Sequence, residues 1–292
     1  MIIDLINKIM EAVVTKRLNL ICFLCIFICV QTTLYADGGL YLFPKGAKAT
    51  GMGKNGLLNV DVWAVYNNQA ALASIENANA GLNYENKFAM KQLGTSAGAF
   101  VVPALTGTFG FSIAHLGIDD YGETRIGAGY GKKIAKRLSL GIQFNYHLLN
   151  FISGYPDFYT FTGEVGLIAE PLDNLFIGAH VFNPTFAKLN SRYEDPVPVT
   201  FKTGVGYKIA GKLMLTAEIE KERYDDVSTR FGIDYSIFKS MSLRTGVSFN
   251  PVEICFGVGW VAKKKLCLDF AFYHHEVLGY SPQLSLSYSF GK

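Results

Sequence analysis

Cysteine is scarce in this chain of 292 residues, and its placement excludes most cysteine chemistry. Of the five cysteines, Cys22, Cys25 and Cys29 lie in an apolar N-terminal stretch, which leaves only Cys255 and Cys267. A short turn separates the two predicted strands that carry these residues and places them several positions apart across the strand pair, so we expect free thiols. After the N-terminal stretch, no Cys-x-x-Cys pair or Cys/His cluster has metal-ligand spacing, and we predict no metal or other cofactor.

Long apolar runs and a strong net charge are also missing. Although 50% of the residues are hydrophobic, no run after the N-terminal stretch is long enough to cross a membrane as a helix. The net charge of +3 is dispersed and forms no basic stripe with interleaved aromatic residues. This pattern excludes nucleic acid as a partner.

Catalytic motifs are absent as well. The sequence has no phosphate-binding loop and no paired-carboxylate motif. Ser139 and His147 share one face of a predicted strand, and His274, His275 and Glu276 are adjacent. Neighbours in an extended strand point to opposite faces, so the second group does not form a metal site. We therefore expect no enzymatic activity.

The sequence has strict alternation instead. Between Leu138 and Leu148, apolar residues occupy every second position, and polar residues or glycine occupy the others. A period of two is typical of a β-strand with one apolar and one polar face. The apolar face is broader than one soluble core could bury, which predicts an all-β fold, a transmembrane antiparallel β-barrel. The same pattern recurs at 199–209, 213–219, 227–235, 241–249 and 284–290.

The N-terminus predicts export from the cytoplasm. Lys16 and Arg17 precede a predominantly apolar stretch at 18–30, and a polar run then leads to Ala36. These are the parts of a secretory signal peptide, so we predict that residues 1–36 are the signal and that cleavage follows Ala36. An uncleaved anchor and a true start at Met10 remain alternatives. Cys29 lacks the small preceding residue that a lipidation site requires.

The alternation and the turn signals predict about fourteen strands between residues 77 and 290. Every second connection is tight, and the intervening connections are mostly longer and more polar. Outer-membrane barrels have short periplasmic turns and longer extracellular loops. We therefore predict a barrel over 77–292 in the outer membrane of a Gram-negative bacterium, in contact with outer-membrane lipid. The tight connections lie at 103–104, 134–136, 171–174, 210–211, 238–240 and 262–264.

Two sequence boxes precede the predicted barrel. The first is Gly46-Ala47-Lys48-Ala49-Thr50-Gly51-Met52-Gly53, and the second runs from Asn59 to Ala73 and contains Tyr66-Asn67-Asn68-Gln69-Ala70-Ala71-Leu72. Together they resemble the N-terminal signature of the PorV/PorQ family and of the wider FadL-like group of barrels. The resemblance implies that residues 37–76 fold as short helices and plug a barrel of fourteen strands. The residues that carry it are Gly46, Ala47, Gly51, Met52, Gly53, Asp61, Asn67, Asn68, Ala71 and Leu72.

The chain departs from that signature at two positions. Lys54 stands where the family has a fourth glycine, and Gln69 replaces a proline. A glycine would favour a tight turn at the first position, and a proline would give a rigid kink at the second. Asn67 and Asn68 can offer side-chain amides to a loop backbone. The alternative to a plug is a periplasmic lead-in helix outside the barrel.

The polar faces of the strands predict the lining of the barrel. They carry charges of both signs, interspersed with Gly127, Gly129, Gly204, Gly206, Gly257 and Gly259. Unpaired charges are costly in a narrow lumen, so the mixture indicates a salt-bridged interior around a plug. A substrate path, with the glycines making room, is the second interpretation. The predicted lumenal residues are Arg125, Glu164, His180, Lys202, Glu218, Arg230, Asp234, Arg244, Glu253 and Asp269.

The resemblance implies two alternative functions. PorV/PorQ-like barrels take part in type IX secretion or surface attachment in Bacteroidetes-type bacteria, with secretion-system or exported surface proteins as partners. A FadL-like channel takes up hydrophobic small molecules. The short loops and the form of the two boxes favour the first function, so we predict a secretion-associated barrel and keep the channel as the alternative.

Overall fold

A computed structural model of the chain describes residues 46–118, 121–151, 156–190, 195–223 and 225–291. The predicted signal peptide at 1–36 and the first part of the predicted plug, 37–45, lie outside the described residues. The chain divides into two units, 1–34 and 35–292, and the fold described below belongs to the second.

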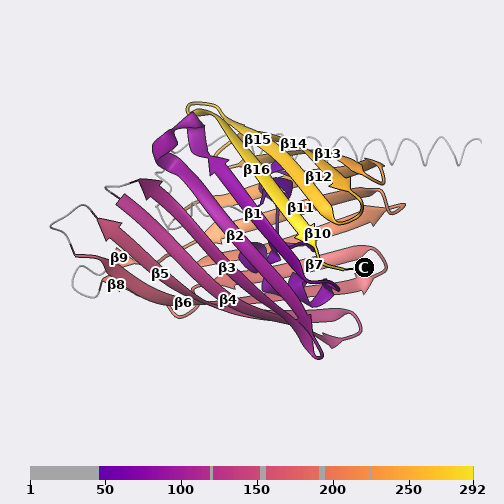
Figure 1. The fold of residues 1–292 in the computed structure, drawn as a ribbon, viewed down its shortest axis with the longest axis horizontal. Coiled ribbons are helices and arrows are strands. Elements are labelled where there is room, and N and C mark those ends of the chain that lie inside the picture. The colour runs from indigo at the N-terminus through magenta and orange to yellow at the C-terminus, as the bar shows by residue number, and fades with distance from the viewer. Residues whose placement is uncertain (1–45, 119–120, 152–155, 191–194, 224, 292) are drawn as a thin grey trace, which may run out of the picture. The chain divides into compact units, whose positions relative to one another are not determined.

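Fourteen strands form a closed antiparallel barrel, which confirms the predicted strand number and the predicted antiparallel β-barrel. Strands that follow each other in the chain pair with each other, except that β7 pairs with β10, and β1 closes the ring with β16 (Figure 1). The barrel strands are β1 (Asn79–Asn86), β2 (Gly94–Ala104), β3 (Gly107–Ile118), β4 (Tyr121–Ala135), β5 (Leu138–Phe151), β6 (Phe158–Leu172), β7 (Leu175–Phe182), β10 (Thr200–Ile209), β11 (Leu213–Glu222), β12 (Val227–Phe238), β13 (Met241–Phe249), β14 (Glu253–Ala262), β15 (Leu266–His275) and β16 (Gly279–Ser289).

The alternation of β5 shows how the sequence makes the barrel wall. Phe144 is 71% exposed on the outer face, whereas its neighbours Gln143 and Asn145 are each 1% exposed on the inner face. Exposed aromatic and aliphatic side chains are unfavourable in water and favourable in hydrocarbon. The outer face of the strand therefore suits a lipid bilayer, and the polar residues face the lumen.

Tight turns join the strands at one end of the barrel, which we call the turn end; the opposite end is the loop end. The turn-end connections are β2–β3, β4–β5, β6–β7, β10–β11, β12–β13 and β14–β15, which agree with the six predicted tight connections. Asn79 at the start of β1 pairs with Ser289 at the end of β16, so the barrel also begins and ends at the turn end.

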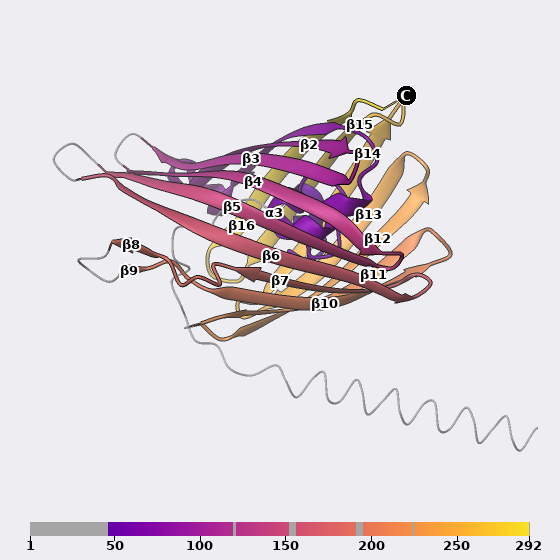
Figure 2. The same cartoon turned by 90° about the horizontal axis from the view of Figure 1, so that it is seen from below.

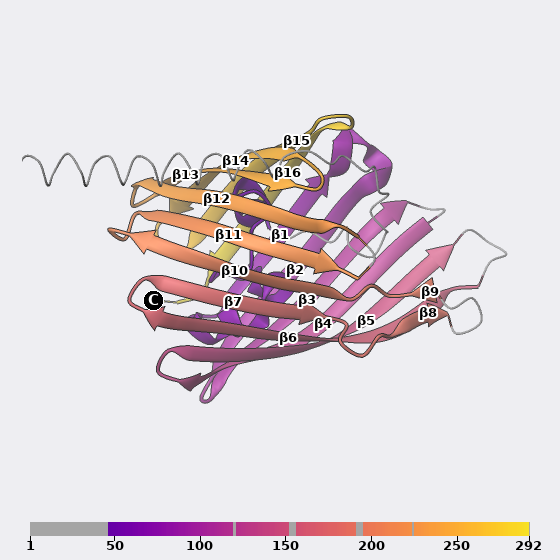
Figure 3. The ribbon, with the colours of Figure 1, turned by 180° about the vertical axis from the view of Figure 1, so that it is seen from behind.

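The loop end contains a small sheet that the sequence did not indicate. The connection at 183–198, one of the longer and more polar connections, contains two short strands, β8 (Lys188–Asn190) and β9 (Asp195–Pro196). They form a separate two-stranded sheet. Figure 3 shows this sheet beyond the ends of β6 and β7, on the opposite side of the barrel from the C-terminus.

Residues 46–76, here called the N-terminal segment, contain helices α2 (Ala47–Gly51) and α3 (Ala64–Asn67) and the 3-10 helix η2 (Gln69–Ser74). Figure 2 shows α3 within the ring of strands. Two more 3-10 turns, η3 (Lys87–Ala89) and η4 (Lys91–Leu93), join β1 to β2 at the loop end. No helix in the described part of the chain is long and apolar enough to cross a membrane.

The two late cysteines are free, as the turn geometry predicted. Cys255 lies opposite Tyr273 on β15, and Cys267 lies opposite Val261 on β14. The register therefore separates the two thiols along the same strand pair.

Candidate functional site

The N-terminal segment lies directly against the inner faces of several strands. A Cβ atom at Gly141 of β5 would collide with the backbone of Gln69 and Ala70. A Cβ atom at Gly51 of α2 would lie 2.9 Å from the Cα of Gly257 on β14. Gly141 in the wall and Gly51 in the segment therefore permit a backbone approach that no other residue would allow.

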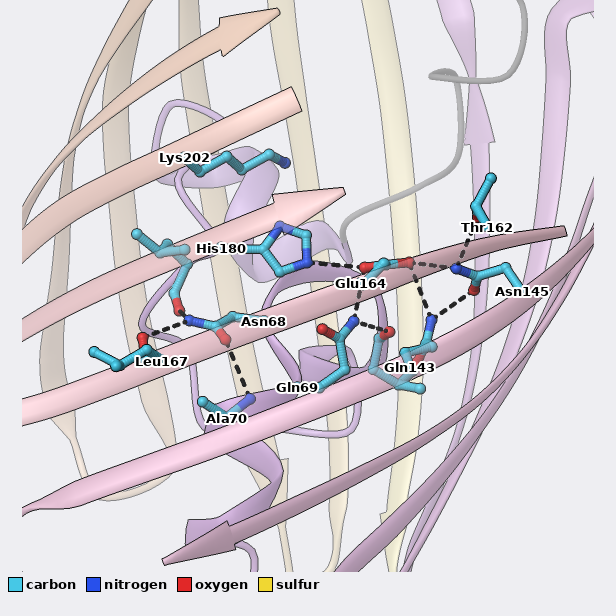
Figure 4. Close-up of polar contacts among 12 residues, drawn as sticks. Asn68, Gln69, Ala70, Gln143, Asn145, Thr162, Glu164, Leu167, His180 and Lys202 are labelled. Atoms are coloured by element: carbon cyan, nitrogen blue, oxygen red, sulfur yellow. Dashed lines mark hydrogen bonds and ion pairs between the residues drawn. The ribbon is translucent and has the colours of Figure 1, made fainter. Parts of the chain in front are cut away.

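The most extensive polar contact between the segment and the wall centres on Glu164 of β6, whose side chain is 1% exposed (Figure 4). Gln69 of the segment donates from Nε2 to Glu164 Oε2 at 2.8 Å. His180 Nε2 lies 2.8 Å from the same oxygen. Arg125 forms an ion pair with the other oxygen, Oε1, which also accepts from Asn145 Nδ2 at 2.8 Å. A buried carboxylate is thus surrounded by donors from three strands and the segment.

Asn68 and Gln69 also shape the segment itself. Asn68 Nδ2 donates to the carbonyl oxygens of Leu57 at 3.1 Å and of Leu167 at 3.3 Å. Asn68 Oδ1 accepts the Ala70 N–H and caps η2. Gln69 Nε2 additionally donates to the Val65 carbonyl at 3.0 Å. The side-chain amide at position 69 therefore fixes the chain path by hydrogen bonds, where a proline would fix it by ring geometry.

A second charged cluster lies on β10, β11 and β12. Arg230 forms ion pairs with Glu218 at 3.1 Å and with Glu220 at 2.6 Å, and Lys202 lies 3.0 Å from Glu220. Glu218 also accepts the backbone N–H of Leu57 at 3.2 Å. This cluster neutralises its own charges and offers one carboxylate oxygen to the segment.

A third charged cluster lies on β12, β13 and β15. Arg244 contacts Asp234 at 3.2 Å and Asp269 at 2.5 Å. Lys48 of α2 lies 3.6 Å from Asp234. Helix α2 is further held by a hydrogen bond of 2.8 Å from the Ala47 N–H to Ser285 Oγ on β16.

Lys54 stands where the PorV/PorQ signature has a fourth glycine, and it adopts the backbone conformation that glycine would favour. Its φ of 61° is left-handed, so the turn forms with a lysine at a position that favours glycine. The Lys54 ammonium lies 2.5 Å from Glu253 and 3.8 Å from the ring centre of Tyr273. A buried ion pair and a cation–π contact compensate for the backbone conformation.

The ten predicted lumenal residues thus fall into three clusters and the Lys54–Glu253 pair, and each group contacts the N-terminal segment. Glu220 was not predicted, because the alternation extends only to residue 219 of β11. Gln143 and Asn145 lie on the inner face, as the alternation at 138–148 predicts, but they are neutral and were not among the predicted lumenal residues. Lys48 and Lys54 belong to the segment, and nothing in the sequence indicated their partners on the wall.

The remaining residues of the two boxes lie inside the segment. Ala71 and Leu72 are buried in η2, and Asp61 accepts the Trp63 N–H at 2.9 Å. Burial raises the pKa of the Asp61 carboxyl, and nearby Lys48 opposes that shift. Burial also raises the pKa of the Tyr66 hydroxyl, which donates a hydrogen bond to the wall at the Ile113 carbonyl, 2.8 Å away.

A pocket of about 380 Å³ opens beside the segment at the turn end. Its apolar lining comes from Leu58 and Val60 of the segment and from Ile168, Phe176 and Met214 of the wall. Lysine and arginine side chains of the β4–β5 and β10–β11 turns surround this lining. Asn59, Glu170 and Asp234 also line the pocket, so it combines apolar, polar and charged side chains, with basic residues at its mouth.

The two weak catalytic candidates do not assemble into sites. His147 Nε2 lies 2.8 Å from Thr162 Oγ1 on the neighbouring strand, and Ser139 lies near the turn end of β5. The ring of His274 packs against Tyr280, and that of His275 packs against Phe88.

No protein-family model matches the chain, and no curated protein matches it in sequence. Solved structures do match. The CymD monoaromatic hydrocarbon channel has a TM-score of 0.67 at 13% identity, over 85% of this chain and 98% of that chain. The fold is that of the FadL-like barrels.

Two further structures agree with this fold. The toluene transporter TodX of P. putida has a TM-score of 0.65 at 13% identity, over 85% of this chain and 99% of that chain. A FadL homologue of Pseudomonas aeruginosa has a TM-score of 0.62 at 13% identity, over 84% and 98%. CymD and TodX are named as a channel and a transporter, and none of these names describes an enzyme.

Proposed function

We propose that this chain is an outer-membrane channel for hydrophobic small molecules, the function that the sequence analysis gave as the alternative. The observation that carries the proposal is the pocket beside the N-terminal segment, where apolar side chains lie next to polar ones, inside a barrel of the FadL-like fold. CymD and TodX share this fold and are named for monoaromatic hydrocarbons and toluene. Concave pockets in which apolar side chains are combined with positioned polar groups are typical of small-molecule sites.

In this proposal the N-terminal segment is the plug. Its contacts with Glu164, Glu218, Asp234 and Glu253 hold it across the lumen, and the wall glycines let it lie close to the strands. A solute that enters from the loop end reaches the turn-end pocket only when part of the segment shifts. The ten lumenal residues therefore hold the plug in place inside the barrel.

The proposal also orients the barrel. Short turns of outer-membrane barrels face the periplasm, and longer loops face the outside. The turn end, with its pocket, is thus periplasmic, and β8 and β9 are extracellular. A solute released from the pocket would enter the periplasm.

The resemblance of the two boxes to the PorV/PorQ signature favours a second candidate, a role in type IX secretion in a Bacteroidetes-type bacterium. That role needs a protein partner at the loop end. The compared structures favour the channel, because those with a named function are transport proteins. Loss of exported surface proteins from cells that lack this chain, with unchanged hydrocarbon uptake, would favour secretion instead.

Uptake of labelled toluene by intact cells tests the channel. In a Gram-negative host that lacks its own hydrophobic-compound channel, the chain should raise the initial rate above the empty-vector rate. Ile168→Trp fills the pocket and should return the rate toward the vector level. Leu167→Trp, at the next position of β6 on the outer face, is the matched control and should keep the rate. A vector-level rate in cells with the folded barrel in the outer membrane would contradict the proposal.

A further inference from the structure

The turn end of the barrel is strongly basic. Four of its six connections carry lysine or arginine: β4–β5, β10–β11, β12–β13 and β14–β15. The only acidic side chain within a turn-end connection is Asp173, and it is paired with Arg137 at 2.5 Å. The loop end, in contrast, carries charges of both signs, such as Asp226 and Glu276 beside Lys87 and Lys91. An excess of positive charge confined to the turn-end connections favours an anionic partner at that end.

The densest basic group is the lysine patch, which we define as Lys239, Lys263, Lys264 and Lys265. These residues belong to the neighbouring β12–β13 and β14–β15 turns, which are joined by a hydrogen bond of 2.9 Å from the Val261 N–H to the Ser240 carbonyl. Lys239, Lys263 and Lys264 are exposed. Neither turn contains an acidic residue, so the patch has no counter-charge of its own.

The backbone of the β14–β15 turn does not favour lysine. Lys263 and Lys264 have φ values of 49° and 59°, and the Lys265 N–H donates to the Ala262 carbonyl at 3.0 Å. A hairpin turn with two successive left-handed residues favours Asn-Gly or Gly-Gly. Two lysines are therefore unfavourable here in backbone conformation, and three adjacent positive charges repel one another. Local stability does not explain them, whereas an external anion does.

Aromatic residues place the patch at a definite level of the barrel. Trp260 is 49% exposed on the outer face, two residues before the end of β14, and Tyr288 is 41% exposed and pairs with Leu266. Tryptophan and tyrosine are enriched at the interface between hydrocarbon and head groups. The lysines follow directly beyond these two residues, at the level where lipid phosphates would lie in the proposed membrane position.

We propose that the lysine patch binds the phosphate groups of anionic phospholipids in the leaflet at the turn end. The inference rests on the proposed position of the barrel in a membrane. The apolar outer face anchors the acyl chains, Trp260 and Tyr288 mark the interface, and the patch supplies the cations. Each lysine near an anionic surface contributes to such binding, and salt weakens it.

Trp260 is a built-in reporter for this binding. The chain has two tryptophans, and Trp63 is 2% exposed inside the barrel, so acyl-chain quenchers reach only Trp260. The purified full-length protein is placed in phosphatidylcholine nanodiscs that contain equal fractions of brominated phosphatidylglycerol or brominated phosphatidylcholine. Brominated phosphatidylglycerol should quench Trp260 more strongly at low salt, and the difference should shrink at high salt.

Three variants make the test specific. Neutralising the patch with K239Q, K263Q, K264Q and K265Q together should lower the preference for phosphatidylglycerol by about fivefold or more. Lys263→Asn with Lys264→Gly installs a favoured turn, so this variant should fold at least as well and still lose part of the preference. Lys87→Gln with Lys91→Gln at the loop end should keep it.

The outcomes distinguish phospholipid binding by the lysine patch from the membrane position of the barrel, on which that binding rests. Equal quenching by the two brominated lipids would overturn the lysine patch as a phospholipid site and leave the membrane barrel intact. Quenching by neither lipid would overturn the membrane placement and the inference together.

Discussion

Removal of residues 46–76 should leave a folded barrel with an open lumen. Every strand from β1 to β16 in the ring has two hydrogen-bonded neighbours, so the barrel needs no backbone contact from the segment. The lumenal ion pairs Arg230–Glu218 and Arg244–Asp269 lie within the wall and would become hydrated. We expect a heat-modifiable barrel with large, long-lived conductance in planar bilayers, where the full chain shows little.

The control for this deletion is the full-length chain with a substitution that weakens the contact between the N-terminal segment and the wall. Gly141→Val pushes a side chain against Gln69 and Ala70 and should give intermediate, fluctuating conductance. Gly163→Val lies on the neighbouring strand, where a Cβ has no heavy atom closer than 4.0 Å, and should behave as the wild type. A deletion variant that folds and stays as impermeable as the full chain would show that the segment is not the plug.

Replacement of Glu164 by leucine should strongly destabilise the barrel. The carboxylate accepts hydrogen bonds from Gln69 and Asn145 and forms the ion pair with Arg125. Removal of one partner from a buried ion pair costs about 3 to 5 kcal/mol. The midpoint of urea unfolding in detergent should therefore fall well below that of the wild type.

The matched variant for Glu164→Leu is the double substitution Arg125→Leu with Glu164→Leu. It removes both charges and should recover much of the lost stability, because hydrophobic replacement of a whole buried pair is often neutral. Glu276→Leu in the loop-end connection is exposed and should leave the midpoint unchanged. Equal midpoints for Glu164→Leu and the wild type would contradict the contacts described around Glu164.

The wall of the barrel was predictable from the sequence because each strand has one apolar and one polar face. Alternation from Leu138 to Leu148 reports directly which side chains face outward, and tight turns report where strands end. The short sheet of β8 and β9 was not predictable, because strands of two or three residues in a polar connection give no periodic signal.

The sequence predicted which charged residues face the interior, but not which of them form pairs. The alternation placed Glu164 and Arg125 on the inner face, but only the closed ring brings β4, β6 and β7 around the same carboxylate. Gln69 and Lys54 depart from the signature, and the sequence could not show how the chain compensates for each departure. Gln69 does so by a hydrogen bond to Glu164, and Lys54 does so by an ion pair with Glu253.

The function was less predictable than the fold. The form of the boxes at 46–53 and 59–73 favours secretion, whereas the channel proposed above starts from a fold shared with CymD and TodX at 13% identity. Function depends on the ligand path and on the loop-end surface, and neither leaves a local pattern in the sequence.

The reactivity of Cys255 tests the central claim most directly. Its thiol is fully buried on the inner face of β14, opposite Gly246, against which Gly53 of the N-terminal segment packs. In a chain that starts at residue 37 and carries Cys267→Ser, a small charged thiol reagent should leave Cys255 unmodified in the folded protein. The same reagent should modify it rapidly after deletion of residues 46–76, and in the full chain after urea unfolding. Equal protection of Cys255 with and without the segment would contradict a lumen covered by residues 46–76.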